Sequence, residues 1–152
     1  MSDGFLQPRT DESSEPFWRY CADGELRIQA CNSCGRRRMP PRPMCPWCHS
    51  LETRWDLMSG AGRVWSFVIV HPPLLAAYAA IAPYNVVVVE LDADPTIRLL
   101  GNLVTDPSGG WDAIDHDPIE IGEAVQVTFD AGSTTSDDEP LPRWVRVTAP
   151  LR

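Results

Sequence analysis

The sequence predicts a mainly β protein: an N-terminal helix and a small four-cysteine ribbon, followed by a five-stranded OB-type β-barrel. Two CxxC pairs lie close together, apolar and polar residues alternate over several segments of strand length, and a long connection interrupts the strands. A chain of 152 residues can form one small domain plus a metal-stabilised lobe. We expect a flexible arm at 1–13, the helix and ribbon at 14–59, and the barrel at 60–152.

The N-terminal part of the chain changes character at Ser14. Residues 1–13 show no apolar periodicity, which is typical of a mobile arm. Ser14-Glu15-Pro16 has the form of a helix start, because proline is tolerated in the first turn. We expect a short helix to about Asp23. Its apolar residues occupy little more than one turn, so it should dock on another surface.

Four cysteines carry the clearest chemical signal. They form two CxxC pairs separated by ten residues: Cys31, Cys34, Cys45 and Cys48. Strands are expected at Leu26–Ala30, leading into the first pair, and at Arg54–Leu57 after the second. This order of strands and pairs is that of a zinc ribbon, in which four thiolates surround one tetrahedral Zn²⁺.

The alternatives to zinc are a rubredoxin-type iron centre, which uses the same ligands, and a pair of redox-active CxxC motifs. A sphere of four thiolates leaves no position for water or substrate. The metal is therefore expected to be structural.

The barrel is expected to begin after a glycine-rich break at Gly60–Gly62. Its five predicted strands are Arg63–His71, Val86–Leu91, Thr96–Val104, Ala124–Phe129 and Arg143–Val147. Both faces of the first strand are largely apolar, which predicts a buried barrel strand. The apolar connection Pro72–Asn85 is interpreted either as a short helix that caps the barrel or as a hydrophobic docking or acyl-chain surface. Five strands fit an OB-type barrel better than a sandwich.

A group of arginines stands out in an acidic chain of net charge −8: Arg36, Arg37, Arg38 and Arg42. Guanidinium groups bind phosphate and carboxylate, so these residues are candidate contacts for an acyl-CoA phosphate or an acidic partner. The alternative is a solvated hairpin whose charges aid solubility.

No catalytic residues are predicted. His71, Ser66 and Glu90 suggest a triad, but no nucleophile elbow accompanies them. A stand-alone nucleic-acid-binding module is the alternative function, because OB barrels and ribbons bind nucleic acid elsewhere, but the net charge of −8 disfavours it. The sequence shows neither an apolar run long enough to span a membrane nor a readable signal peptide. We therefore expect a cytoplasmic protein that does not associate with a membrane.

Several motifs in order resemble one family: PFW, LRIQACNSCG, MPPRPMCPWC, GRVWSF, APYNVVVVELD and IGEAVQVTF. They are similar to the rubredoxin-like zinc-ribbon plus OB-fold proteins described as acyl-CoA-associated, or domain of unknown function thirty-five. The resemblance covers roughly residues 16–147, and its most specific part is the run CxxCG, PPR, CPxC.

The resemblance implies that the four cysteines bind zinc and that the chain is a non-catalytic accessory subunit in a hetero-oligomer. Its implied partner is a thiolase-superfamily enzyme, either an acyltransferase or a lipid-transfer-protein-like aldolase of steroid side-chain degradation. Catalytic residues would then lie on the partner, and acyl-CoA is a candidate ligand.

Overall fold

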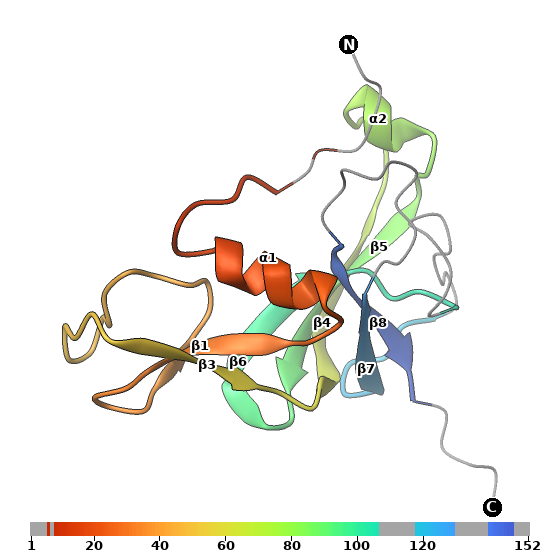
Figure 1. The fold of residues 1–152 in the computed structure, drawn as a ribbon. Helices are drawn as coiled ribbons and strands as arrows, with labels where there is room; N and C mark the ends of the chain where they lie inside the picture. Colours follow the sequence, from red (N-terminus) through yellow and green to blue (C-terminus); the bar gives the residue numbers. More distant parts are fainter. Residues whose placement is uncertain (1–5, 7, 107–117, 130–139, 148–152) are drawn as a thin grey trace, which may run out of the picture.

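The computed structural model describes residues 6, 8–106, 118–129 and 140–147. In chain order the elements are α1 (Glu15–Ala22), β1 (Arg27–Cys31), β2 (Arg37–Arg38), β3 (Thr53–Leu57), β4 (Ala61–Val70), α2 (Ala76–Ala79), β5 (Tyr84–Leu91), β6 (Asp94–Gly101), β7 (Ala124–Phe129) and β8 (Pro142–Arg146). They form a three-stranded sheet, β2-β1-β3, and a five-stranded sheet, β6-β5-β4-β7-β8 (Figure 1). Of the predicted flexible segment at 1–13, residues 1–5 and 7 lie outside the described residues.

The helix α1 packs on the ribbon strand β1. Phe17 and Cys21 are buried on its inner face and belong to the same apolar cluster as Ile28 of β1. Asp11 supports the start of the helix, since its carboxylate accepts a hydrogen bond from the backbone N–H of Ser14 (2.8 Å). The predicted docking helix is thus present, and Cys21 is a buried core residue.

The five-stranded sheet closes into a barrel where the end of β6 meets β8. Leu103 forms a parallel bridge with Trp144, and Val104 donates its backbone N–H to the carbonyl of Trp144 (2.8 Å). Trp144 is fully buried among the inward-facing residues of β5, such as Val87 and Val89. Alternate residues of β5 are buried, as expected for a strand with one face on the core.

A buried polar network holds this closure in place. The side chain of Asn85 donates to the carbonyl of Leu103 (2.9 Å) and accepts from its N–H (2.7 Å). Arg143 donates to the side-chain oxygen of Asn102 (2.6 Å). Buried polar groups need such partners, so this network favours one register between β5, β6 and β8.

The prediction that the first barrel strand is buried on both faces is wrong for its second half. Trp65 and Val68 of β4 are 50% and 57% exposed. In the described part of the chain, β7 pairs with β4 over Ala61–Arg63, and from Ser66 to Val70 the strand that pairs with β4 is β5. Apolar character alone does not reveal whether a second strand or sheet will cover a face.

The helix α2 lies at the end of this β4–β5 hairpin, away from the ribbon (Figure 1), and contains no buried residue. The expectation that the connection caps the barrel is therefore wrong. Among the described residues, no helix is long and apolar enough to cross a membrane.

Candidate metal centre and adjoining pocket

The four predicted ligands meet at one end of the ribbon. The Sγ atoms of Cys31, Cys34, Cys45 and Cys48 all lie within 4.8 Å of one another. The Sγ atoms of Cys31 and Cys48 are 3.5 Å apart, and those of Cys34 and Cys45 are 3.6 Å apart. Four thiolates at about 2.3 Å from a tetrahedral zinc ion would be about 3.8 Å apart, so the sulfur positions fit the ion.

The two CxxC turns have the same backbone design. Gly35 donates its N–H to the carbonyl of Cys31 (2.9 Å), and His49 donates to the carbonyl of Cys45 (2.9 Å). Both donors adopt a left-handed backbone, with φ of +73° for Gly35 and +59° for His49. Glycine adopts this conformation readily, and the histidine is its non-glycine counterpart in the second turn. His49 thus shapes the turn, while the four sulfurs provide the ligand set.

The thiols differ in their affinity for protons. A hydrogen bond from the backbone N–H of Cys34 lowers the pKa of Cys31 to about 6. At Cys48 the backbone N–H of Ser50 favours the thiolate, but the neighbouring thiols and burial raise its pKa to about 12. Adjacent thiolates repel one another, so the cluster holds four negative charges only when a cation is bound. This donor set is suited to a structural metal ion.

The four arginines of the predicted basic group do not share one surface. Neighbouring residues of β2 point to opposite faces, so Arg37 and Arg38 diverge. Arg38 is 4% exposed, and its Nη2 donates to the carbonyl of Arg42 (3.1 Å). The prediction that the four arginines form one basic group is therefore wrong for Arg38. Arg36 and Arg42 are exposed.

Arg37 joins the ribbon to the barrel. Its Nε lies 2.9 Å from the carboxylate of Asp56 in the ribbon, and its Nη1 lies 3.4 Å from the carboxylate of Asp94 in β6. Burial raises the pKa of Asp94, but hydrogen bonds from Thr96 and Arg37 outweigh this and lower it overall. Asp94 is therefore ionised at neutral pH and bridges the two parts of the molecule.

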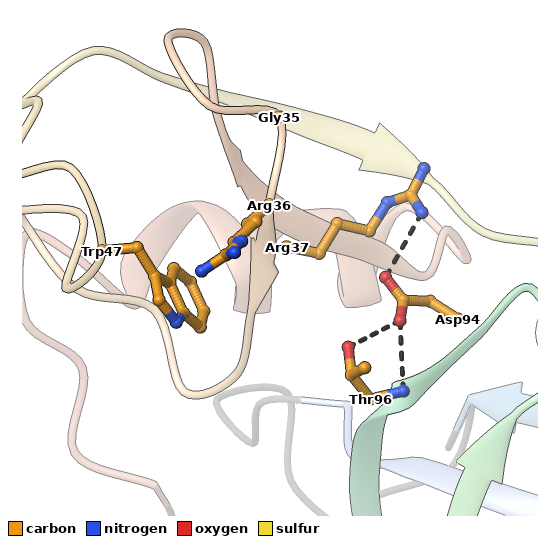
Figure 2. A pocket seen from close by; sticks show the side chains of 6 residues that line it. All are labelled: Gly35, Arg36, Arg37, Trp47, Asp94 and Thr96. Carbon is orange, nitrogen blue, oxygen red and sulfur yellow. Dashed lines mark hydrogen bonds and ion pairs between the residues drawn. The ribbon is translucent and has the colours of Figure 1, made fainter.

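A pocket of about 390 Å³ lies at this junction (Figure 2). Its lining residues are Gly35, Arg36, Arg37, Trp47, Asp94 and Thr96. The guanidinium of Arg36 lies 5.3 Å from the ring centroid of Trp47, a cation–π contact. Asp94 and Thr96 were not among the predicted site residues, because no local motif reveals the contact between Arg37 and Asp94, which are 57 residues apart.

The residues of the suggested triad are not brought together. Ser66 lies within β4, and His71 follows the end of that strand, so five extended residues, about 16 Å, separate them. Glu90 is bound by Arg98 (2.8 Å). The described residues contain no triad at this place.

Two family models match consecutive parts of the chain. One is described as the ChsH2 rubredoxin-like zinc ribbon domain and matches residues 18–54, and the other as the ChsH2 C-terminal OB-fold domain and matches residues 55–130. The chain belongs to the ChsH2 family of zinc-ribbon and OB-fold proteins. The predicted resemblance and fold class are thereby confirmed.

The relatives fall into two groups, scaffold proteins and hydratase alpha subunits. A DUF35 domain-containing scaffold protein of Methanothermobacter thermautotrophicus is 33% identical over 74% of this chain and 77% of its own length. A probable enoyl-CoA hydratase alpha subunit of Thermomonospora curvata is 38% identical over 79% of this chain. The 3-oxo-4,17-pregnadiene-20-carboxyl-CoA hydratase alpha subunit of Mycobacterium tuberculosis is 32% identical over 84%. This chain spans 34% and 37% of the length of these two subunits.

Among solved structures, a chain of the Ltp2-ChsH2(DUF35) aldolase superposes with a TM-score of 0.75 at 29% identity. The match covers 92% of this chain and 98% of that chain. The likeness therefore includes both the ribbon and the barrel.

Proposed function

We propose that the protein is a non-catalytic scaffold subunit that assembles with a thiolase-type catalytic subunit acting on acyl-CoA. The observation that carries this proposal is the match, over nearly the whole of both chains, to a chain of the two-component Ltp2-ChsH2(DUF35) aldolase. The scaffold description of the archaeal relative supports it. The CoA esters named for the two hydratase subunits, one of them a steroid derivative, favour acyl-CoA and steroid side chains as the substrate class.

The metal site supports a scaffold role rather than catalysis. Four thiolates complete the coordination sphere, so a zinc ion held by Cys31, Cys34, Cys45 and Cys48 has no open position for a substrate oxygen. We assign Zn²⁺ to the site because four cysteines in a zinc-ribbon fold are its usual ligands. In this account the ion stabilises the ribbon, and the reacting groups lie on the partner. A cytoplasmic location stays a prediction.

Arg36 and Arg42 are the arginines that we propose as contacts for acyl-CoA or for the partner. Both are exposed, and Arg36 lies beside the ring of Trp47 at the rim of the junction pocket. A guanidinium next to an aromatic face suits a phosphate linked to a planar base. Arg37 and Arg38 have internal partners and are assigned to the stability of the ribbon.

The test is co-purification of the tagged chain from its native cell, with mass spectrometry of the bound proteins and a zinc assay. Recovery of a thiolase-superfamily enzyme with about one zinc per chain is expected. Recovery of nucleic acid in place of such an enzyme would instead support the alternative of a nucleic-acid-binding module.

The substrate contact is tested in the reconstituted complex. Arg36→Ala should raise KM for acyl-CoA several-fold and leave kcat unchanged, because the contact lies outside the reacting groups. Arg19→Ala, on the exposed face of α1, is the matched control and should leave both constants unchanged. Equal KM values for the Arg36 variant and the wild type would remove Arg36 from the proposed contacts.

A further inference from the structure

The outer part of the β4–β5 hairpin, residues 65–84, extends from the barrel. It is called the arm below and is distinct from the N-terminal segment 1–13. Between Arg63 and Glu90 the sequence has no Asp, Glu, Lys or Arg, although 22% of the whole chain is charged. No residue of the arm is buried. Leu6 approaches its tip and donates its backbone N–H to the hydroxyl of Tyr78 (3.1 Å), yet Leu75 remains 64% exposed.

One edge of the arm is open. β4 pairs with β5 along the hairpin as far as Val70, and its other side pairs with β7 over Ala61–Arg63. The backbone of Val64 makes the last bonds on that side, to Glu123 and Gly122. From Trp65 to Val70, no described residue pairs with the outer edge.

This open edge lacks the features that usually protect edge strands. Its sequence, WSFVIV, is rich in β-branched and aromatic residues and has neither a charge nor a proline. An exposed edge of this kind pairs readily with another strand, so soluble proteins normally blunt it with lysine, proline or a covering element. A segment without such protection is expected to be covered in the working assembly.

Trp65 gives the arm a rigid anchor at its base. It lies at the bulge between Val64 and Ser66, and the guanidinium of Arg98 lies 4.1 Å from its ring centroid. Arg98 is fixed by two hydrogen bonds to the carboxylate of Glu90, at 2.8 and 3.1 Å. Tryptophan and arginine are enriched among the residues that dominate binding energy, and side chains already held in place lose less entropy on binding.

We propose that the arm and the open edge of β4 form the docking surface for the thiolase-type catalytic subunit, which covers the edge with an extended apolar segment. This inference rests on the proposed function. A stable interface uses about 20–30 residues a side, and the arm with the adjoining Arg98 supplies a set of that size. The net charge of −8 argues against nucleic acid or an anionic membrane as the occupant. A solved relative of nearly the same extent is part of a two-protein aldolase, which favours a protein partner.

The experiment uses the full-length zinc-loaded chain and the purified catalytic subunit identified by co-purification. Val68→Asp and Ile69→Asp place a charge on exposed positions of the arm and should weaken binding by about 30-fold or more. Leu57→Asp introduces the same charge at a 60% exposed position of the ribbon strand β3, and it should change the Kd by less than about threefold. Circular dichroism and zinc content verify that each variant is folded.

Hydrogen exchange of the wild-type complex provides a test that does not depend on variants. Amides of Trp65–Val70 on the open edge should exchange at least about tenfold more slowly in the complex, because a new strand protects them. Unchanged exchange together with wild-type affinity of the two arm variants would overturn the inference while leaving the complex intact. Failure of the wild-type chain to bind any thiolase-type subunit would instead refute the proposed function. A homodimer that the arm variants dissociate would assign the surface to a second copy and overturn the choice of occupant.

Discussion

The ribbon and the arm, residues 65–84, differ in how many stabilising contacts they make within the chain. The ribbon is polar and is held by contacts among its own residues: its four thiols converge on one point, and Arg37 and Arg54 both contact Asp56. The arm is apolar and contributes no buried residue to the core. A small lobe such as the ribbon can therefore be stabilised by a metal site and ion pairs without a large core. An apolar hairpin without a covering layer has no such contacts, and it is the part of this fold that requires a partner.

The largest expected effect comes from removing a metal ligand. Cys45→Ser deletes a fully buried thiolate, and structural zinc in small modules contributes on the order of 10 kcal/mol of apparent binding energy. The variant should lose its zinc and the ordered ribbon, as measured by metal analysis and by rapid proteolysis within residues 27–57. Cys21→Ser is the control outside the ligand set and should retain zinc. A zinc-free Cys45 variant with wild-type thermal stability would contradict the account of the ribbon.

Acidification should act on the same site. Because the pKa of Cys31 is lowered from its ordinary value of 9.0 to about 6, its thiolate favours the folded ribbon most above pH 9, and this contribution is lost as the pH falls from there through about 6. Protons then compete with the metal, so zinc affinity should decline steeply below pH 6. A chelating dye titrated at pH 7.5 and pH 5 measures the change. Equal affinity at the two pH values would be inconsistent with thiolate ligands.

A matched pair of valines compares the arm directly with the core. Val87→Ala removes two methyl groups from a fully buried position and should cost about 2 kcal/mol of unfolding free energy. Val68→Ala makes the same change in the arm and should stay within about 0.5 kcal/mol in the isolated chain. Urea denaturation measures both values. A cost for Val68→Ala equal to that for Val87→Ala would mean that the arm is packed in solution.

The smallest effect is expected at the junction between ribbon and barrel. Arg37→Ala removes partly exposed ion pairs with Asp56 and Asp94 and should cost about 1 kcal/mol. A double-mutant cycle with Asp94→Ala isolates the bond that crosses the junction, and its coupling energy should be about 0.5 kcal/mol. Arg19→Ala, whose partner Glu15 is largely exposed, should have almost no effect. A coupling energy of zero would mean that the bridge does not hold the ribbon to the barrel.

Local patterns were sufficient to predict much of the fold. The spacing of the cysteines predicts their convergence, and alternation predicts the strands because one face of each meets the core. The predicted ends of the strands are less accurate. β6 begins at Asp94, two residues before the predicted start, because a tight turn pairs Asp94 with Leu91.

Tertiary features were beyond the reach of such patterns. Arg38 looks like a surface charge in the sequence but is buried beside β1, where Gln29 is its cross-strand neighbour. The open edge of β4 depends on where β7 stops pairing, which no residue of β4 encodes. The pocket at the junction depends on contacts between the ribbon and β6 that are distant in sequence.

The central claim is that this chain completes a thiolase-type catalytic subunit. The most direct measurement is the rate of acyl-CoA carbon–carbon bond cleavage or formation by the purified catalytic subunit, alone and after addition of the zinc-loaded chain. The account predicts little activity from the subunit alone and at least a tenfold increase at one equivalent of the chain. Full activity of the catalytic subunit alone, unchanged by the addition, would contradict it.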